Sequence, residues 1–259
     1  MTSPRRSTSS TPTSSGSRNS PTRATGPPPT PTSAPCRHRR RRPHRSHCSR
    51  SAERATRALP YELHTDASTD PGEGTVTLQF LNTGHKGAVF HVYDRLHLDR
   101  IPRRYTVEAG KRLADIWDTM ATDSGAYDLE VHGPGGFFRS FAGTTASEGG
   151  PELRVRYDRH GKSAVLTVRN PGPKAVTLHV EPHAYRFSEP RTIHVPAREE
   201  VERHWSLKPS GHSYDFTVTM YGSSLERRFA GRVETGRDGI SDPAMAAHLQ
   251  RPENPVVVG

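Results

Sequence analysis

The histidines and cysteines near the N-terminus are the residues of this sequence best suited to bind a metal ion. The segment CRHRRRRPHRSHC offers five donors, namely Cys36, His38, His44, His47 and Cys48. Tetrahedral zinc sites need two close pairs of thiolate or imidazole ligands, separated by a loop that can fold. Here the separating loop is a block of arginines, whose positive charge opposes a bound cation. We therefore expect a solvated basic segment rather than a zinc site.

Motifs that mark a catalytic site are missing from the sequence. It contains no G-x-S-x-G, no H-E-x-x-H and no G-x-x-x-x-G-K-[ST]. The glycine-rich segment HGPGGFF is better explained as a hairpin turn than as a phosphate-binding loop. His91 and His179 stand at matching positions of a repeat, and we interpret them as a structural legacy of duplication. We therefore predict no catalytic residue, no metal ligand, no cofactor-binding residue and no cofactor for this chain.

The repeat is visible in one phrase that the chain writes twice. YDLEVHGPGGFFRSFAG, at residues 127–143, returns as YDFTVTMYGSSLERRFAG at residues 214–231. A shift of 88 positions also places Trp117 on Trp205. The offset slips to 87 at the YD pair and returns to 88 at the closing FAG, so both length changes fall in turn-like segments. Such placement indicates a duplicated fold.

Alternating apolar and polar residues within each copy indicate half-buried antiparallel strands. In the first copy we expect strands at about 61–66, 75–81, 88–93, 103–108, 112–118, 126–132 and 136–142. In the second copy we expect them at about 152–157, 163–169, 176–181, 192–196, 200–206, 213–219 and 224–230. Seven short strands per copy predict an all-β protein made of two tandem immunoglobulin-like β-sandwiches after a disordered basic N-terminal tail. The expected domains are a tail at 1–58, sandwich repeats at 59–147 and 148–237, and a C-terminal tail at 238–259.

The predicted core residues of the two sandwiches also match between the copies. They are Trp117, Trp205, Tyr127, Tyr214, Phe141 and Phe229. The alternation puts Arg139 and Arg227 on the same inward face as the phenylalanines, which is unexpected for a charged side chain. Asp115 could pair with Arg139, but the equivalent of Asp115 in the second copy is Arg203. The sequence therefore leaves the recurring arginines unexplained.

The charge of the chain is concentrated in the N-terminal stretch. Residues 1–58 carry 13 Arg, no Lys and one acidic residue, whereas the whole chain has a net charge of +10, so the remainder is slightly acidic. That stretch has no large apolar residue after Met1, which predicts disorder. Interleaved aromatic residues are missing from it, so nucleic acid is not an expected partner. Its composition is also that of GC-rich coding DNA translated in the wrong frame.

The sequence leaves the location of the protein open. No run of 18 apolar residues could form a transmembrane helix. Arg5 and Arg6 are followed by no apolar stretch, so we do not expect a usable signal peptide.

Three segments together resemble the C-terminal region of bacterial phosphocholine-preferring phospholipase C. They are GAVFHVYD at 87–94, RRYTVEAGKRLADIWD at 103–118 and GAYDLEVHGPGGFFRSFAG at 125–143. The resemblance extends from about Ala52 to Met245. It implies a secreted family that hydrolyses phosphatidylcholine or sphingomyelin in lipid catabolism, with two copies of a β-rich domain behind an α/β catalytic domain.

This chain lacks segments that match the family's catalytic domain, so no catalytic residue can be carried over. We expect a non-catalytic accessory region, a truncated or frame-shifted remnant whose partners are a phospholipase catalytic domain or a phospholipid surface. Two alternatives remain open at this point. The chain could be a free-standing binding or adhesion module of two sandwiches, or a phosphodiester hydrolase in its own right.

Overall fold

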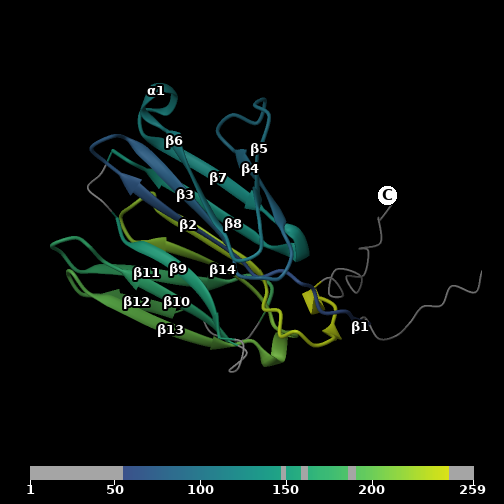
Figure 1. Cartoon of the computed structure of the whole chain (residues 1–259). Coiled ribbons are helices and arrows are strands. Elements are labelled where there is room, and N and C mark those ends of the chain that lie inside the picture. The colour runs from purple at the N-terminus through teal and green to yellow at the C-terminus, as the bar shows by residue number, and fades with distance from the viewer. Residues whose placement is uncertain (1–54, 147–149, 159–162, 186–190, 245–259) are drawn as a thin grey trace, which may run out of the picture. The chain divides into compact units, whose positions relative to one another are not determined.

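The computed structural model describes residues 55–146, 150–158, 163–185 and 191–244. Most of the predicted N-terminal tail, with its cysteines, and most of the predicted C-terminal tail lie outside these described residues. The described part is built of β-strands with three single-turn helices, as the alternation predicted (Figure 1).

The first repeat is a sandwich of two antiparallel sheets. Its strands are β2 (Leu63–Asp70), β3 (Thr75–Asn82), β4 (Ala88–Asp94), β5 (Arg103–Val107), β6 (Arg112–Asp118), β7 (Ala126–His132) and β8 (Phe138–Thr144). One sheet has the order β2-β3-β6, and the other contains β5-β4-β7-β8. The short helices α1 (Met120–Asp123) and η1 (Pro134–Gly136) connect β6 to β7 and β7 to β8.

The second repeat has the same order of elements. Its strands are β9 (Glu152–Asp158), β10 (Ser163–Arg169), β11 (Val176–Pro182), β12 (Arg191–Val195), β13 (Glu200–Ser206), β14 (Ser213–Met220) and β15 (Glu226–Arg232). β13-β10-β9 form one sheet, and β12-β11-β14-β15 belong to the other. The helix η2 (Lys208–Ser210) stands where α1 stands in the first repeat.

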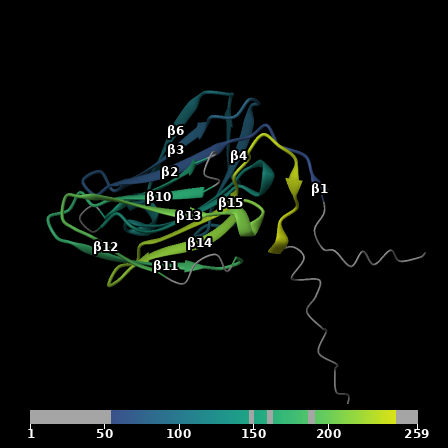
Figure 2. The ribbon, with the colours of Figure 1, turned by 90° about the horizontal axis from the view of Figure 1, so that it is seen from below.

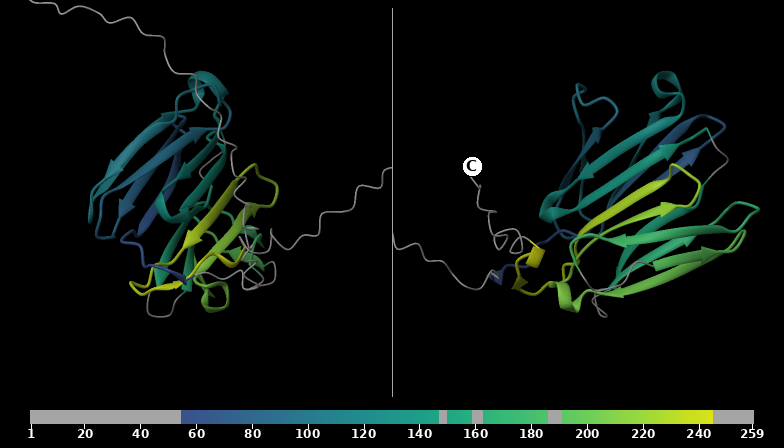
Figure 3. Two further views of the ribbon diagram at one scale, coloured as in Figure 1. Left: turned by 90° about the vertical axis from the view of Figure 1, so that its right-hand side faces the viewer. Right: turned by 180° about the vertical axis from the view of Figure 1, so that it is seen from behind.

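The two sandwiches are joined through one continuous sheet. β15 of the second repeat pairs with β8 of the first, so the eight strands run in the order β12-β11-β14-β15-β8-β7-β4-β5. In this antiparallel seam Arg227 lies opposite Phe141, and Phe229 lies opposite Arg139. Figures 2 and 3 show the layers from below, from the side and from behind.

The prediction of β-sandwiches is confirmed. In each repeat the fourth strand pairs beside the third, which gives three strands in one sheet and four in the other. The constant-type immunoglobulin domain instead places its fourth strand in the opposite sheet. The finer assignment as immunoglobulin-like therefore stays a prediction.

Each sandwich encloses its own apolar core because alternate side chains of every strand point inward. Leu78, Phe80 and Phe90 are fully buried in the first core, and Leu166 and Leu178 are fully buried in the second.

A repeated asparagine fixes the turn after the second strand of each repeat. Asn82 donates from Nδ2 to the backbone oxygens of Lys86 and Val107, and its Oδ1 accepts from the backbone N–H of Gly84. Asn170 makes the equivalent bonds, donating to the backbone oxygens of Lys174 and Val195 and accepting from the N–H of Gly172. A buried amide that satisfies backbone groups in this way specifies the turn.

Candidate functional site: the seam between the repeats

The six predicted core residues lie in matching places of the two sandwiches. Trp117 and Trp205 are 8% and 3% exposed, and all four others are buried, namely Tyr127, Tyr214, Phe141 and Phe229. Trp117 is covered on one side by the Arg103 guanidinium, whose Cζ lies 3.8 Å from the ring centroid. Leu113, on the same face of β6 four residues before Trp117, is 41% exposed. The inward-facing side chains of β6 are therefore buried only near the end of the strand.

Arg139 crosses the seam from the first repeat into the second. It is 1% exposed. Its Nη1 donates to the backbone oxygens of Phe138 (2.7 Å) and Ala230 (2.9 Å). Its Nη2 donates to the hydroxyls of Tyr214 (2.9 Å) and Tyr157 (3.0 Å). Burial raises the pKa of Tyr214 well above its ordinary value, so this hydroxyl meets the guanidinium as a neutral group.

Arg227 makes the reciprocal crossing from the second repeat into the first. It is 4% exposed. Its Nη1 donates to the backbone oxygens of Ala142 (2.5 Å) and Glu226 (2.8 Å), and its Nη2 donates to the hydroxyl of Tyr127 (2.5 Å). Each repeat therefore sends one arginine to the tyrosine of the other. The sequence could not show this, because each arginine and its tyrosine belong to different copies.

No carboxylate forms an ion pair with either arginine among the described residues. A guanidinium keeps its charge when buried, so that charge must be stabilised by other groups. Carbonyl and hydroxyl oxygens accept its N–H bonds, and aromatic rings lie beside it. The Cζ of Arg139 is 4.3 Å from the ring centroid of Phe137, and that of Arg227 is 5.3 Å from the ring of Tyr127. These cation–π contacts strengthen when water is excluded.

The glycine that closes each repeated phrase makes room for the tyrosine. A Cβ at Gly143 would lie 2.9 Å from the hydroxyl of Tyr127, and one at Gly231 would lie 3.0 Å from that of Tyr214. A side chain at either position would push the hydroxyl away from its arginine. The phrase written twice in the sequence, from YD to FAG, thus encodes the tyrosine, the arginine and the glycine of this crossed pair.

The predicted pair between Asp115 and Arg139 is wrong. Asp115 lies on β6 in the three-stranded sheet and accepts from Arg103 Nη1 (2.7 Å) and from the hydroxyl of Tyr105 (2.5 Å). Arg139 lies on β8 at the seam, where three of its four hydrogen-bond acceptors belong to the second repeat. Having Arg203 in place of Asp115 in the second repeat therefore removes no partner from either buried arginine.

The first described residues of the chain contact residues close to its C-terminal end. β1 (Ala55–Thr56) pairs with β16 (Gly239–Ile240). The sequence pattern predicts residues 55–58 in the disordered tail, whereas in the structure they belong to this ordered contact. We call residues 55–59, with the residues 232–240 that they touch, the N-terminal clasp.

Side chains of the second repeat hold the clasp. Glu234 Oε2 accepts from the backbone N–H of Leu59 at 3.1 Å, and Arg232 Nη1 donates to Thr56 Oγ1 at 2.7 Å. Asp238 Oδ1 accepts from the N–H of residue 58 at 3.0 Å.

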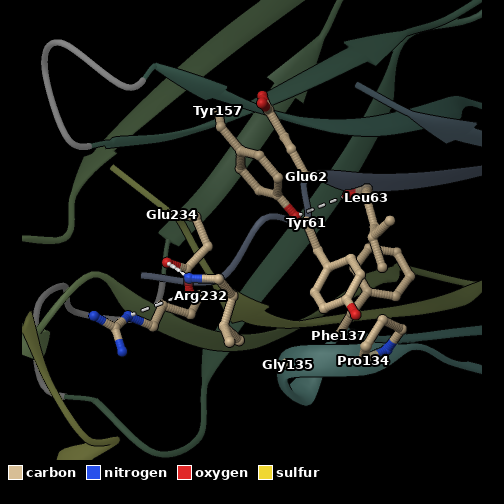
Figure 4. A pocket seen from close by; sticks show the side chains of 10 residues that line it. Tyr61, Glu62, Leu63, Pro134, Gly135, Phe137, Tyr157, Arg232 and Glu234 are labelled. Atoms are coloured by element: carbon tan, nitrogen blue, oxygen red, sulfur yellow. Dashed lines mark hydrogen bonds and ion pairs between the residues drawn. The ribbon is translucent and has the colours of Figure 1, made fainter. Parts of the chain in front are cut away.

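The pocket in Figure 4 lies beside the clasp. Tyr61, Phe137 and Pro134 from the first repeat face Tyr157 and Arg232 from the second. Its free volume is about 20 Å³, close to what a single water needs. This pocket is therefore part of the packing between repeats and has no room for a substrate.

A loop with exposed aliphatic side chains connects β4 to β5, and we call its residues 95–102 the apical loop. Leu98 and Ile101 in this loop are 71% and 88% exposed. His97 Nε2 lies 2.7 Å from Asp123 Oδ1, which ties the loop to α1. Figure 1 shows this loop and α1 at one end of the sandwich, away from β1.

The described residues offer neither a metal-binding cluster nor a membrane-spanning helix. No group of three or more His, Cys, Asp or Glu that could hold a metal ion occurs among them. His91 is half-buried and His179 is exposed, on equivalent strands of the two repeats. Within the same residues, no helix is long and apolar enough to cross a membrane.

The amino-acid sequence of this chain is similar to those of known proteins. The sequence model described as "Bacterial phospholipase C, C-terminal domain" matches the chain twice, at residues 55–144 and 151–232. The non-hemolytic phospholipases C of Pseudomonas aeruginosa and Burkholderia pseudomallei are 44% and 42% identical to it over 199 and 198 residues. The hemolytic phospholipase C of Pseudomonas aeruginosa is 35% identical over 220 residues. Each match covers 74% of this chain but only 28–30% of the relative.

Proposed function

This chain belongs to the family of the bacterial phospholipase C C-terminal domain, and on that premise we propose that it is a non-catalytic accessory region. Its role would be to hold a phospholipase catalytic domain in a fixed orientation at a phospholipid surface. Two findings support a non-catalytic role. The chain spans about 28% of the length of the non-hemolytic relatives, and its conspicuous polar cluster, the crossed arginines and tyrosines, is buried in the seam.

The N-terminal clasp is the observation that carries this proposal. A short linker would let a preceding domain turn freely, because such domain motion is the default where few contacts cross a boundary. Here the backbone at Leu59 is bonded to Glu234, and β1 is paired with β16. Whatever precedes residue 55 in a relative of this kind would leave from a point fixed to both sandwiches.

The apical loop supports the lipid half of the proposal. The transfer of exposed aliphatic side chains from water into the interfacial region of a bilayer is favourable. Leu98 and Ile101 are accompanied by Arg100 and Arg103, which are 46% and 48% exposed and paired with carboxylates. Such paired charges fit the zwitterionic surface of phosphatidylcholine better than a strongly anionic surface.

A chimera tests the proposed role. The matched C-terminal region of the non-hemolytic Pseudomonas aeruginosa enzyme would be replaced by residues 55–244 of this chain. We expect the chimera to hydrolyse phosphatidylcholine in vesicles, whereas the enzyme without any C-terminal region should hydrolyse only a water-soluble phosphocholine ester well. A chimera no better on vesicles than the shortened enzyme would overturn the proposal.

A matched variant of the chimera tests the clasp itself. Glu234→Gln with Asp238→Asn weakens the bonds to the backbone of residues 58 and 59 without touching either core. Vesicle hydrolysis should fall, while hydrolysis of the soluble ester should stay unchanged. An equal loss on both substrates would instead indicate damage to the catalytic domain.

A further inference from the structure

The two arginine sites of the seam differ in one residue. Tyr157 on β9 lies opposite Ala164, and Thr69 on β2 lies opposite Val76, so these two residues occupy equivalent positions 88 apart. At the first site the hydroxyl of Tyr157 takes an N–H of Arg139. At the second site the short threonine stands where that tyrosine would be.

This difference leaves hydrogen-bond donors without acceptors at the second site. Of the five N–H groups of a guanidinium, Arg227 directs three to Ala142, Glu226 and Tyr127. Neither the other N–H of Nη2 nor the hydroxyl proton of Tyr127 has an acceptor among the described residues. At the first site the corresponding hydroxyl, of Tyr214, lies 2.7 Å from the Tyr157 hydroxyl.

A hollow occupies the position that a tyrosine would fill. Arg227, Tyr127 and Thr69 line it together, and its volume is about 260 Å³. One water takes about 30 Å³ of liquid volume, so the hollow can hold a small organic molecule. Met220 and Leu225 add apolar wall, which favours a ligand with an apolar body.

We propose that this hollow, the Arg227 pocket, binds a small organic oxyanion such as an aromatic phosphate monoester. The anionic oxygens would accept the free N–H of Arg227 and the O–H of Tyr127, as the Tyr157 hydroxyl accepts at the other site. A buried guanidinium without a carboxylate partner favours a charged acceptor over a neutral one. Glu152 also lines the pocket, but its carboxylate is paired with Arg154 at 3.1 Å and Arg169 at 3.5 Å.

Titration of the full chain with phenyl phosphate tests the proposal. We expect saturable binding with one site per chain in calorimetry, and weaker binding of inorganic phosphate, which lacks the ring. Thr69→Tyr should fill the pocket with the missing phenol. This variant should bind phenyl phosphate at least tenfold more weakly, and its thermal midpoint should rise because the free donors gain an acceptor.

The chain also offers the opposite substitution as a control. Tyr157→Thr opens the equivalent space beside Arg139, and it should add a second phenyl phosphate site. Should Thr69→Tyr fail to fold, Thr69→Phe provides the same block without the hydroxyl and should also abolish binding. Equal binding by the wild type and a folded Thr69 variant would assign the anion to the arginines of residues 1–58 and overturn the proposal. This test does not depend on the accessory role proposed above.

Discussion

At the scale of single residues, the seam explains why two arginines stand on an inward face. Arg139 and Arg227 each leave their own repeat and bond to a tyrosine of the other. Burying a charge is costly unless its hydrogen bonds are satisfied. Removing one partner from a buried network lowers the stability of the protein by more than the whole network contributes to it, because the remaining group stays buried and unsatisfied. The crossed pair is therefore most sensitive to the loss of a single hydroxyl.

Tyr127→Phe should destabilise the protein by about 1–3 kcal/mol, because it leaves an N–H of Arg227 buried without an acceptor. Chemical denaturation of the variant and the wild type measures the difference. Tyr221→Phe is the matched control, since Tyr221 is 92% exposed and its change should cost nothing measurable. Equal stabilities for Tyr127→Phe and Tyr221→Phe would show that the hydroxyl bond across the seam contributes little.

His64 should make the protein sensitive to acid. Burial, with the nearby charges of Arg156 and Arg139, lowers the pKa of His64 to about 4. Its unfolded value is about 6.5, so the unfolded chain binds more protons between these two pH values. The free energy of unfolding should therefore fall by about 2–3 kcal/mol from pH 7 to pH 4.5 on account of this group.

Urea denaturation at both pH values checks this, with His64→Gln as the comparison. The variant should lose less stability on acidification than the wild type. If the two proteins lose the same amount, acid sensitivity comes from other groups.

At the scale of elements, the pairing of β8 with β15 joins the two repeats into one hydrogen-bonded sheet. The duplication by itself suggests two sandwiches that unfold separately. The shared eight-stranded sheet and the crossed arginines connect the two cores instead. We expect the repeats to unfold together.

Replacing Trp205 by Ala tests this coupling. Removing a large buried aromatic should cost roughly 3–5 kcal/mol. The fluorescence of Trp117, in the other repeat, should then report the same lowered midpoint as circular dichroism of the whole chain. A Trp117 signal that kept the wild-type midpoint would mean that the repeats unfold independently. The reciprocal variant, Trp117→Ala followed through Trp205, should behave alike.

The apical loop is the element expected to contact lipid. The double change Leu98→Ser and Ile101→Ser should reduce binding to phosphatidylcholine vesicles by roughly tenfold for each side chain, since each loses its apolar transfer energy. Vesicle sedimentation measures this. Val89→Ser, a 39% exposed residue near the other end of β4, is the control and should bind as the wild type does. Unchanged binding by the double variant would move the lipid contact elsewhere.

At the scale of the whole molecule, the proposed division of labour leaves the chemistry to another domain. The two family matches cover the described sandwiches, and the family they define is a C-terminal domain. The polar groups that the fold gathers join the two repeats and hold the clasp.

The purified chain should accordingly show no phospholipase C activity. Phosphatidylcholine, sphingomyelin and a chromogenic phosphocholine ester should all remain intact above a heat-treated control, with or without added metal ions. Turnover above that control would revive the alternative that this chain is a hydrolase in its own right.

The sequence by itself determined the strands, the duplication and the core positions. A period of two fixes which side chains share a face, so β10 and β13 begin and end where the alternation predicted. The offset of 88 likewise identified Trp117 and Trp205 as equivalents. These features depend on neighbours along the chain, which a single sequence displays.

Only the tertiary structure decided what the inward arginines touch. Alternation indicates the face of Arg139 but not which strand edge lies beside β8, and the partner strand β15 is far away in the chain. The same holds for Tyr157 and Thr69, whose difference matters only because Tyr157 bonds to one arginine of the seam and Thr69 lines a pocket with the other. Contacts between distant segments depend on how the two sandwiches join, and no local pattern in the sequence encodes that choice.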